Sequence, residues 1–274
     1  MQWWCAALGE QWSWTWRAYP GVWLFVIVVI AKLRWLAGPG SWARAGAGER
    51  AAFVVGALSL WLSLDWPLGP IAAGYLASAH ALQFLIITMI AAPLLLLGAR
   101  TGIAERLPSL AIPRLPAAAS VLSRDALRFV AHPLIAVVVF NVVVAVTHMP
   151  SVVDTLMLTA RGAFLVDFAW FAGGALFWWP VIMPWPAFRH FGAPMKILYL
   201  LIGTLFHTVI GMIMLTAELP IYGIFELAPP IVPIPPRADQ QLAGGIMELG
   251  VFFAIVIGSA VLFFRMAAED ERRT

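Results

Sequence analysis

The stretch Ile71–Leu97, IAAGYLASAHALQFLIITMIAAPLLLL, decides the fold class because it contains no Lys, Arg, Asp or Glu. A helix needs about 20 mostly apolar residues to cross a bilayer, where its backbone must be hydrogen-bonded internally. This stretch is therefore long enough to cross a membrane. The whole chain agrees, since 62% of its 274 residues are hydrophobic and 11% are charged. We expect an all-α, multi-pass membrane protein.

Six further apolar stretches predict a bundle of seven transmembrane helices in a single domain covering 1–274. The connectors between them are rich in proline and glycine, which favour loops over helix interiors. No basic cluster precedes an apolar stretch at the start of the chain, so we expect no cleaved signal peptide. The predicted spans are 19–36, 51–66, 71–97, 130–148, 163–183, 197–217 and 242–264.

The basic residues predict the orientation, because cytoplasmic loops of membrane proteins are enriched in Lys and Arg. With these spans, one side receives every basic residue except Arg17, Arg161 and Arg237. The N-terminus is therefore expected outside and the C-terminus in the cytoplasm, with the cytoplasmic stretch 98–129 lying on anionic lipid. The net charge of +3 is small and lies in short loops, which argues against nucleic-acid binding.

The start of the chain is rich in tryptophan. Indole rings favour the interface between lipid and water, so we expect this segment to anchor the chain at the outer face. The tryptophans concerned are Trp3, Trp4, Trp12, Trp14, Trp16 and Trp23.

The predicted orientation places most strongly polar groups of the spans near the outer leaflet. Ionisable groups at membrane depth are costly, so each is a candidate for function. His80 and Gln83 fall in the outer part of the third span, and His148 closes the fourth. The other outer candidates for orienting a ligand or binding a partner are Asp154, Asp167, His207, Glu218, Asp239, Gln240, Gln241 and Glu248.

Helical spacing predicts small-and-polar stripes on two spans, because residues three, four or seven apart share a face. Small residues let helices approach closely, and polar residues hydrogen-bond across the contact. The sixth span has Gly203, His207, Gly211, Met214 and Glu218, and the seventh has Gln241, Gly244, Gly245 and Glu248.

A purely structural role stays open for these polar groups. Gln83, Asn141 and His207 can simply tie helices together. Asp167 and Glu248 can be buried in pairs, for example with Arg161 or Gln241, or protonated.

His80 and His148 form the most informative pair, because two imidazoles at similar depth can bind a metal or a haem. Imidazole nitrogen and thioether sulfur suit Cu(I), so Met149 and Met247 are added as possible ligands. Carboxylates could orient the imidazoles; the candidates are Asp154, Asp239 and Glu248. The alternative is a membrane cytochrome with the two histidines as opposed axial ligands of a haem.

Other chemistries find little support in the residues. The only cysteine, Cys5, excludes an internal disulfide and a thiolate pair for copper. A retinal Schiff base needs a lysine deep in a helix, whereas Lys32 and Lys196 are both predicted at cytoplasmic ends. The sequence has no His-Glu-x-x-His motif, and we do not expect an enzyme.

Three blocks of sequence follow one another in a specific order. The first is HALQ at 80–83 with AAPLLLLG at 91–98. The second combines HP at 132–133, HMP at 148–150 with Asp154, and GALFWWP at 174–180. The third combines PIY at 220–222 with DQQLAGGIM at 239–247. In order and spacing, these blocks resemble the cytochrome c oxidase assembly factor family of the CtaG type.

The resemblance implies a membrane assembly factor for a haem-copper cytochrome c oxidase in a bacterial inner membrane. It further implies assistance in copper delivery or insertion at the outer face. The partners implied are the lipid bilayer, oxidase subunits and other copper chaperones.

The chain departs from the family pattern around the expected site. Phe84 replaces a second histidine, Thr147 replaces a tryptophan, and Glu248 replaces an aromatic residue. The fifth span lacks the family's histidine-rich start and carries Thr159, Arg161 and Asp167 instead. A divergent membrane subunit with a structural or docking role is therefore a second alternative.

Overall fold

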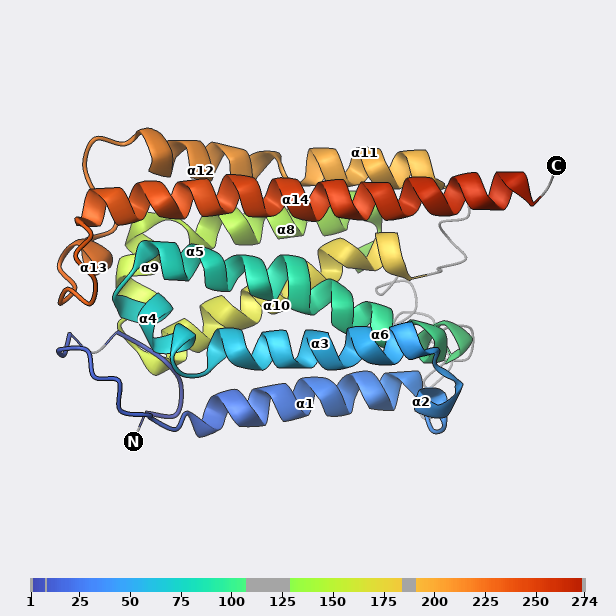
Figure 1. The fold of residues 1–274 in the computed structure, drawn as a ribbon, viewed down its shortest axis with the longest axis horizontal. Coiled ribbons are helices and arrows are strands. Elements are labelled where there is room, and N and C mark those ends of the chain that lie inside the picture. The colour runs from blue at the N-terminus through green and yellow to red at the C-terminus, as the bar shows by residue number, and fades with distance from the viewer. Residues whose placement is uncertain (1, 8, 107–128, 184–190, 273–274) are drawn as a thin grey trace.

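The computed structural model describes residues 2–7, 9–106, 129–183 and 191–272, and within these ranges it contains helices and no strand. The longer helices run side by side along the long axis of the molecule (Figure 1). They are α1 (Pro20–Ala37), α3 (Ala47–Leu64), α5 (Ala77–Leu85), the π-helical η1 (Ile86–Ala91), α6 (Ala92–Arg106), α8 (Pro133–Thr147), α10 (Ala160–Ile182), α11 (Ala193–Gly203), α12 (Leu205–Thr216) and α14 (Pro236–Glu271).

Short helices lie at the two ends of the bundle. At one end are α4 (Leu68–Gly74), α9 (Pro150–Leu156) and α13 (Gly223–Glu226), and α2 (Ser41–Arg44) lies at the other, near the end of α6 (Figure 1). The C-terminal end of α14 extends from the α2 end (Figure 1). The predicted polar sites and the predicted basic loops therefore fall at opposite ends.

The described helices include six that are long and apolar enough to cross a membrane. They are α1, α3, the continuous α5–η1–α6, α10, α11–α12 and α14. The pair α8 and α9 also passes this test as a unit, bent by 70°, and brings the number to seven. The structure supports an all-helical, multi-pass protein, whereas the side on which each terminus lies stays a prediction.

The third span is the centre of the bundle, but its predicted bounds were wrong. It runs over Ala77–Arg106, and its most apolar window is 72% buried, against 17% for α14. Residues 71–74 belong instead to α4, whose chain turns at Tyr75 and Leu76 before α5 begins. The beginning of α5 is fixed by Asp239 of α14, which accepts hydrogen bonds from the Ala77 and Ser78 amides at 2.6 and 3.3 Å.

Other span boundaries also moved outward. The helix of the sixth span begins at Ala193, before the predicted start at 197, and α14 covers Pro236–Glu271, which extends beyond the predicted span 242–264 at both ends. Residues 98–106, predicted as part of a cytoplasmic loop, continue α6. A helix can continue through polar residues beyond its apolar stretch, because its backbone groups stay hydrogen-bonded to one another. Residues 107–128 of the same predicted loop lie outside the described residues.

Basic side chains gather where α1, α2 and α6 end. Arg34 lies over the Trp42 ring at 4.8 Å, and Arg44 pairs with Glu105 at 2.9 Å. Arg106 donates a hydrogen bond of 2.8 Å to the Trp35 carbonyl. Basic residues that were predicted on the cytoplasmic side of the membrane therefore lie together at one end of the bundle.

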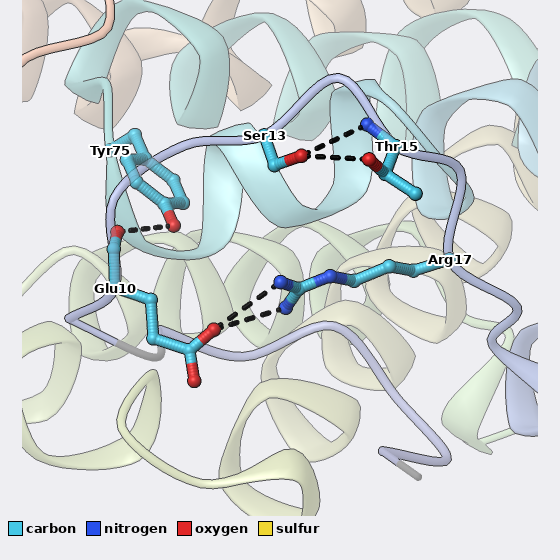
Figure 2. Close-up of polar contacts among 5 residues, drawn as sticks. All are labelled: Glu10, Ser13, Thr15, Arg17 and Tyr75. Atoms are coloured by element: carbon cyan, nitrogen blue, oxygen red, sulfur yellow. Dashed lines mark hydrogen bonds and ion pairs between the residues drawn. The ribbon is translucent and has the colours of Figure 1, made fainter.

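The N-terminal segment folds over the opposite end. Its loop is closed by Arg17, whose guanidinium lies 3.3 Å from the Glu10 carboxylate, and is tied to the bundle by Tyr75, which donates to the Glu10 carbonyl at 2.9 Å (Figure 2). Trp14 and Trp16 are exposed, as expected of interfacial anchors. Trp4 is fully buried, so the prediction of an interfacial position was wrong for this residue.

The small-and-polar stripes pack α12 against α14. Gly211 and Gly244 are buried at the contact, and a Cβ on Gly244 would lie 2.6 Å from the Gly211 carbonyl oxygen. His207 and Met214 are buried on the same stripe, whereas Glu218 lies beyond the end of α12 and is exposed. Helix spacing therefore predicted the two stripes, and the structure shows that they pack against each other.

Replacing Gly244 with alanine should destabilise the bundle by about 1–3 kcal/mol, because the backbones cannot separate without losing contacts. Gly245→Ala is the matched control, since a Cβ there meets nothing within 4 Å, and it should stabilise α14 by about 0.5–1 kcal/mol. Thermal unfolding in detergent compares the two variants. Equal midpoints would contradict the described packing.

Candidate functional site

Three histidines from three helices converge near one end of the core. His80 lies on α5, His148 follows the last residue of α8, and His207 lies on α12; all three are buried. The ring centroids of His80 and His148 are 6.3 Å apart. The Phe84 ring packs against His148 and His207, with its centroid 4.9 Å from that of His148 and 5.3 Å from that of His207. The two imidazoles predicted as ligands therefore lie together.

Backbone carbonyls hold the first two imidazoles. Nδ1 of His80 lies 3.1 Å from the Ala72 carbonyl, and Nδ1 of His148 lies 2.9 Å from the Val144 carbonyl. Because a carbonyl only accepts, each Nδ1 carries the proton and each neutral ring keeps a lone pair on Nε2. Both Nε2 atoms are buried without a hydrogen-bond partner among the described residues. This is the arrangement of a metal-binding histidine, with its second nitrogen fixed.

His207 differs from the other two. Neither of its ring nitrogens has a hydrogen-bond partner among the described residues. Its ring lies between Phe84 and Phe140, with the Phe140 centroid at 5.2 Å. The hypothesis that this residue ties helices by hydrogen bonding is therefore not supported. Leaving a buried imidazole unpaired costs free energy, which marks it as a possible neighbour of a ligand.

The two predicted thioether ligands lie in different surroundings. Met149 is 50% exposed at the bend between α8 and α9, so it does not share the burial of the imidazoles. Met247 is fully buried on α14, the helix that packs against α5. Among the described residues, no group of three His, Cys, Asp or Glu side chains is arranged to hold a metal. The candidate centre is thus a pair of imidazoles.

The carboxylates predicted to orient the imidazoles cap helices instead. Asp239 accepts from the first amides of α5 and from the Ser78 hydroxyl. Asp154 accepts from the Gly223 and Ile224 amides at 3.1 and 3.0 Å, at the start of α13. Because unpaired amides at a helix start favour negative charge, these acids fix backbone geometry. The prediction that carboxylates orient the imidazoles was wrong. Backbone carbonyls hold the two imidazole rings instead.

The buried amide side chains join neighbouring segments. Gln83 donates to the Ser63 carbonyl on α3 at 3.0 Å, and Asn141 donates to the Gly203 carbonyl on α11 at the same distance. Gln240 accepts from the Ile221 amide at 2.6 Å. These contacts support the structural role left open for Gln83 and Asn141. Gln241 is half-buried on α14.

Asp167 and Glu248 do not pair as predicted. Asp167 is buried on α10 and accepts a hydrogen bond of 2.8 Å from the Trp4 indole, while Arg161 is exposed. Glu248 is half-buried and turns its carboxyl toward Gly211 on α12, and not toward Gln241. The Trp4 contact spans 163 positions, so no local pattern could have indicated it.

Trp170 is a site residue that the sequence reasoning missed. Its ring lies 4.9 Å from His80 and 5.8 Å from His148, and its indole donates to the Thr147 hydroxyl at 2.8 Å. Position 170 is one turn after Asp167, on the same helix face, which is the signal that could have found it. Phe84 and Trp170 place aromatic rings against the imidazoles, and Thr147 holds the Trp170 indole.

A multi-pass helical bundle with paired, carbonyl-anchored imidazoles near one end defines an integral membrane protein with a candidate metal-binding centre. The family model for the cytochrome c oxidase caa3 assembly factor, Caa3_CtaG, matches residues 22–269. The chain belongs to this family, which confirms the family predicted from the three sequence blocks. No curated protein and no solved structure matches the chain.

Removing the cap of α5 should destabilise the site end of the bundle. Asp239→Ala leaves the buried Ala77 and Ser78 amides unpaired, at a cost of about 1–3 kcal/mol. Glu218→Ala, which removes an exposed acid, should change stability by less than about 0.5 kcal/mol. Thermal unfolding in detergent measures both. An Asp239→Ala variant as stable as the parent would refute the capping role.

Proposed function

We propose that this oxidase assembly factor holds one Cu(I) ion as cargo between His80 and His148 and delivers it at the outer membrane face. The observation that carries the proposal is the pair of buried Nε2 atoms, without a hydrogen-bond partner in the described part of the chain, on rings whose centroids are 6.3 Å apart. Metal–nitrogen bonds of about 2 Å on each side account for about 4 Å of that separation. The remainder equals the two ring radii, so the separation matches one ion shared by two Nε2 atoms that face each other.

The surroundings favour a monovalent ion over a divalent one. Phe84 and Trp170 flank the imidazoles, and the carboxyl groups of Asp154, Asp167 and Asp239 are engaged by backbone amides or by Trp4. Neutral ligands cannot compensate a second charge in an apolar site, where burying charge is costly. Cu(I) also accepts few, soft ligands, which lets the ion leave during transfer. These properties support a carrier and not a catalyst.

Met149 offers a route to the surface. It follows His148 directly and is 50% exposed at the bend between α8 and α9. A thioether there can pass Cu(I) between the buried imidazoles and a partner, because soft ligands exchange this ion readily. The partners proposed are oxidase subunits and other copper chaperones. The proposed location of the protein is a bacterial inner membrane. The orientation drawn from the basic residues supports delivery on the outer side.

Haem binding finds less support in this geometry. A porphyrin between two axial histidines needs open space around the line that joins the rings. Phe84 and Trp170 lie within 5.8 Å of these imidazoles and fill that space. A docking role without copper remains the alternative that the binding experiment separates.

Cu(I) titration of the detergent-purified protein tests the proposal. We expect about one ion per chain for the parent and loss of tight binding for His80→Ala and His148→Ala, because one remaining imidazole cannot hold the ion alone. His132→Ala is the matched control, since His132 is exposed at the other end of α8 and should leave the stoichiometry unchanged.

Thermal unfolding of each apo variant checks that it is folded. Equal copper stoichiometry in the double variant and the parent would contradict the site. A parent that binds no Cu(I) would leave docking on the oxidase as the function. A Soret band in the purified parent would instead establish the haem alternative.

A further inference from the structure

A long apolar groove lies away from the histidines, on the outside of the bundle. It is formed by α5, η1 and α6 on one wall, α14 on another, and the adjoining ends of α10 and α11. Its volume is about 1040 Å³, at the upper end of the range for ligand pockets. Apart from four charged residues, its lining is apolar or glycine, with Met89, Trp178 and Phe253 among the large side chains.

Three cations meet in this groove. Arg100 comes from α6, Lys196 from the first turn of α11, and Arg265 from α14. Lys196 lies within electrostatic range of both arginines. The helix ends that carry them are at the same end of the bundle as α2 (Figure 1). This is the end whose basic residues predict a cytoplasmic position.

Two of these cations are anchored by the end of α10. Arg100 donates through Nε to the Ile182 carbonyl, and Lys196 donates through Nζ to the Val181 carbonyl, both at 3.0 Å. The last carbonyls of a helix lack internal donors, so they hold cations in place. The remaining guanidinium and ammonium protons are left for another acceptor.

Among the described residues, no acid forms an ion pair with a cation of this cluster. The ion pairs in the described ranges are Arg17–Glu10 and Arg44–Glu105, and neither involves a cation of the groove. Glu269 also lines the groove, one turn beyond Arg265, so three cations face one acid and the charge there stays positive. Like charges held together beside an apolar surface are costly unless an anion joins them.

We infer that the groove binds one anionic phospholipid, with its phosphate at Arg100, Lys196 and Arg265 and its acyl chains along the apolar walls. A phospholipid carries the anion and the apolar chains in one molecule. A partner helix would cover the apolar walls but would still have to supply an anion at this one end. Basic pockets between transmembrane helices bind anionic headgroups on the same physical grounds. This inference does not depend on the copper proposal.

The test uses delipidated full-length protein in detergent, titrated with phosphatidylglycerol or phosphatidylcholine and followed by native mass spectrometry. We expect one phosphatidylglycerol per chain at concentrations where phosphatidylcholine does not bind. Arg265→Gln should weaken phosphatidylglycerol about fivefold, the effect of losing one cation near a lipid headgroup. Arg272→Gln, at the position that follows the last residue of α14 and outside the groove lining, is the control and should change nothing.

A second pair of variants tests the acyl-chain wall. Ala254→Trp places a large ring in the groove and should abolish phosphatidylglycerol binding, whereas Leu249→Trp, on an exposed position of α14 outside the lining, should not. Thermal unfolding in detergent checks that both variants are folded. Equal binding of the two lipids, or competition by inorganic phosphate alone, would overturn the inference. So would a second copy of the chain seated in the groove.

Discussion

The structure depends on one constraint: a polar group inside a membrane bundle must find its partner within the chain. At the histidine pair this constraint is met by backbone carbonyls. Ala72 engages Nδ1 of His80, and Val144 engages Nδ1 of His148. Each bond fixes the ring and its tautomer, so the remaining nitrogens keep buried lone pairs. The proposed copper binding follows from this arrangement, because Nδ1 is hydrogen-bonded to a carbonyl and Nε2 keeps its lone pair for a metal.

The same constraint explains why acids surround the site without entering it. Asp239 and Asp154 are committed to helix starts, and Asp167 is committed to the Trp4 indole. Their carboxyl oxygens therefore accept hydrogen bonds from amides and an indole, not from the imidazoles. The pair stays neutral and enclosed by Phe84 and Trp170, which favours a soft monovalent ion as cargo. At the opposite end, carbonyls of α10 hold cations for an anion that the described acids do not provide.

The sequence predicted what depends on composition and local spacing. Apolar length predicted the spans, glycine spacing predicted the stripes that contain Gly211 and Gly244, and polar placement put His80 and His148 at one end. It could not predict contacts between distant segments. The Asp239 cap and the Trp4–Asp167 bond join positions 162 and 163 apart, and both depend on how helices pack. The start of the third span was misplaced for this reason, since its cap comes from α14.

The most direct measurement of the central claim is X-ray absorption at the copper edge of the Cu(I)-loaded, detergent-purified protein. The account predicts a low-coordinate ion whose first shell contains two imidazole nitrogens, with multiple-scattering features from the rings. His80→Ala, which should not hold the ion tightly, should show no two-imidazole first shell. A first shell made only of sulfur, or a spectrum unchanged in the His80→Ala and His148→Ala variants, would contradict it.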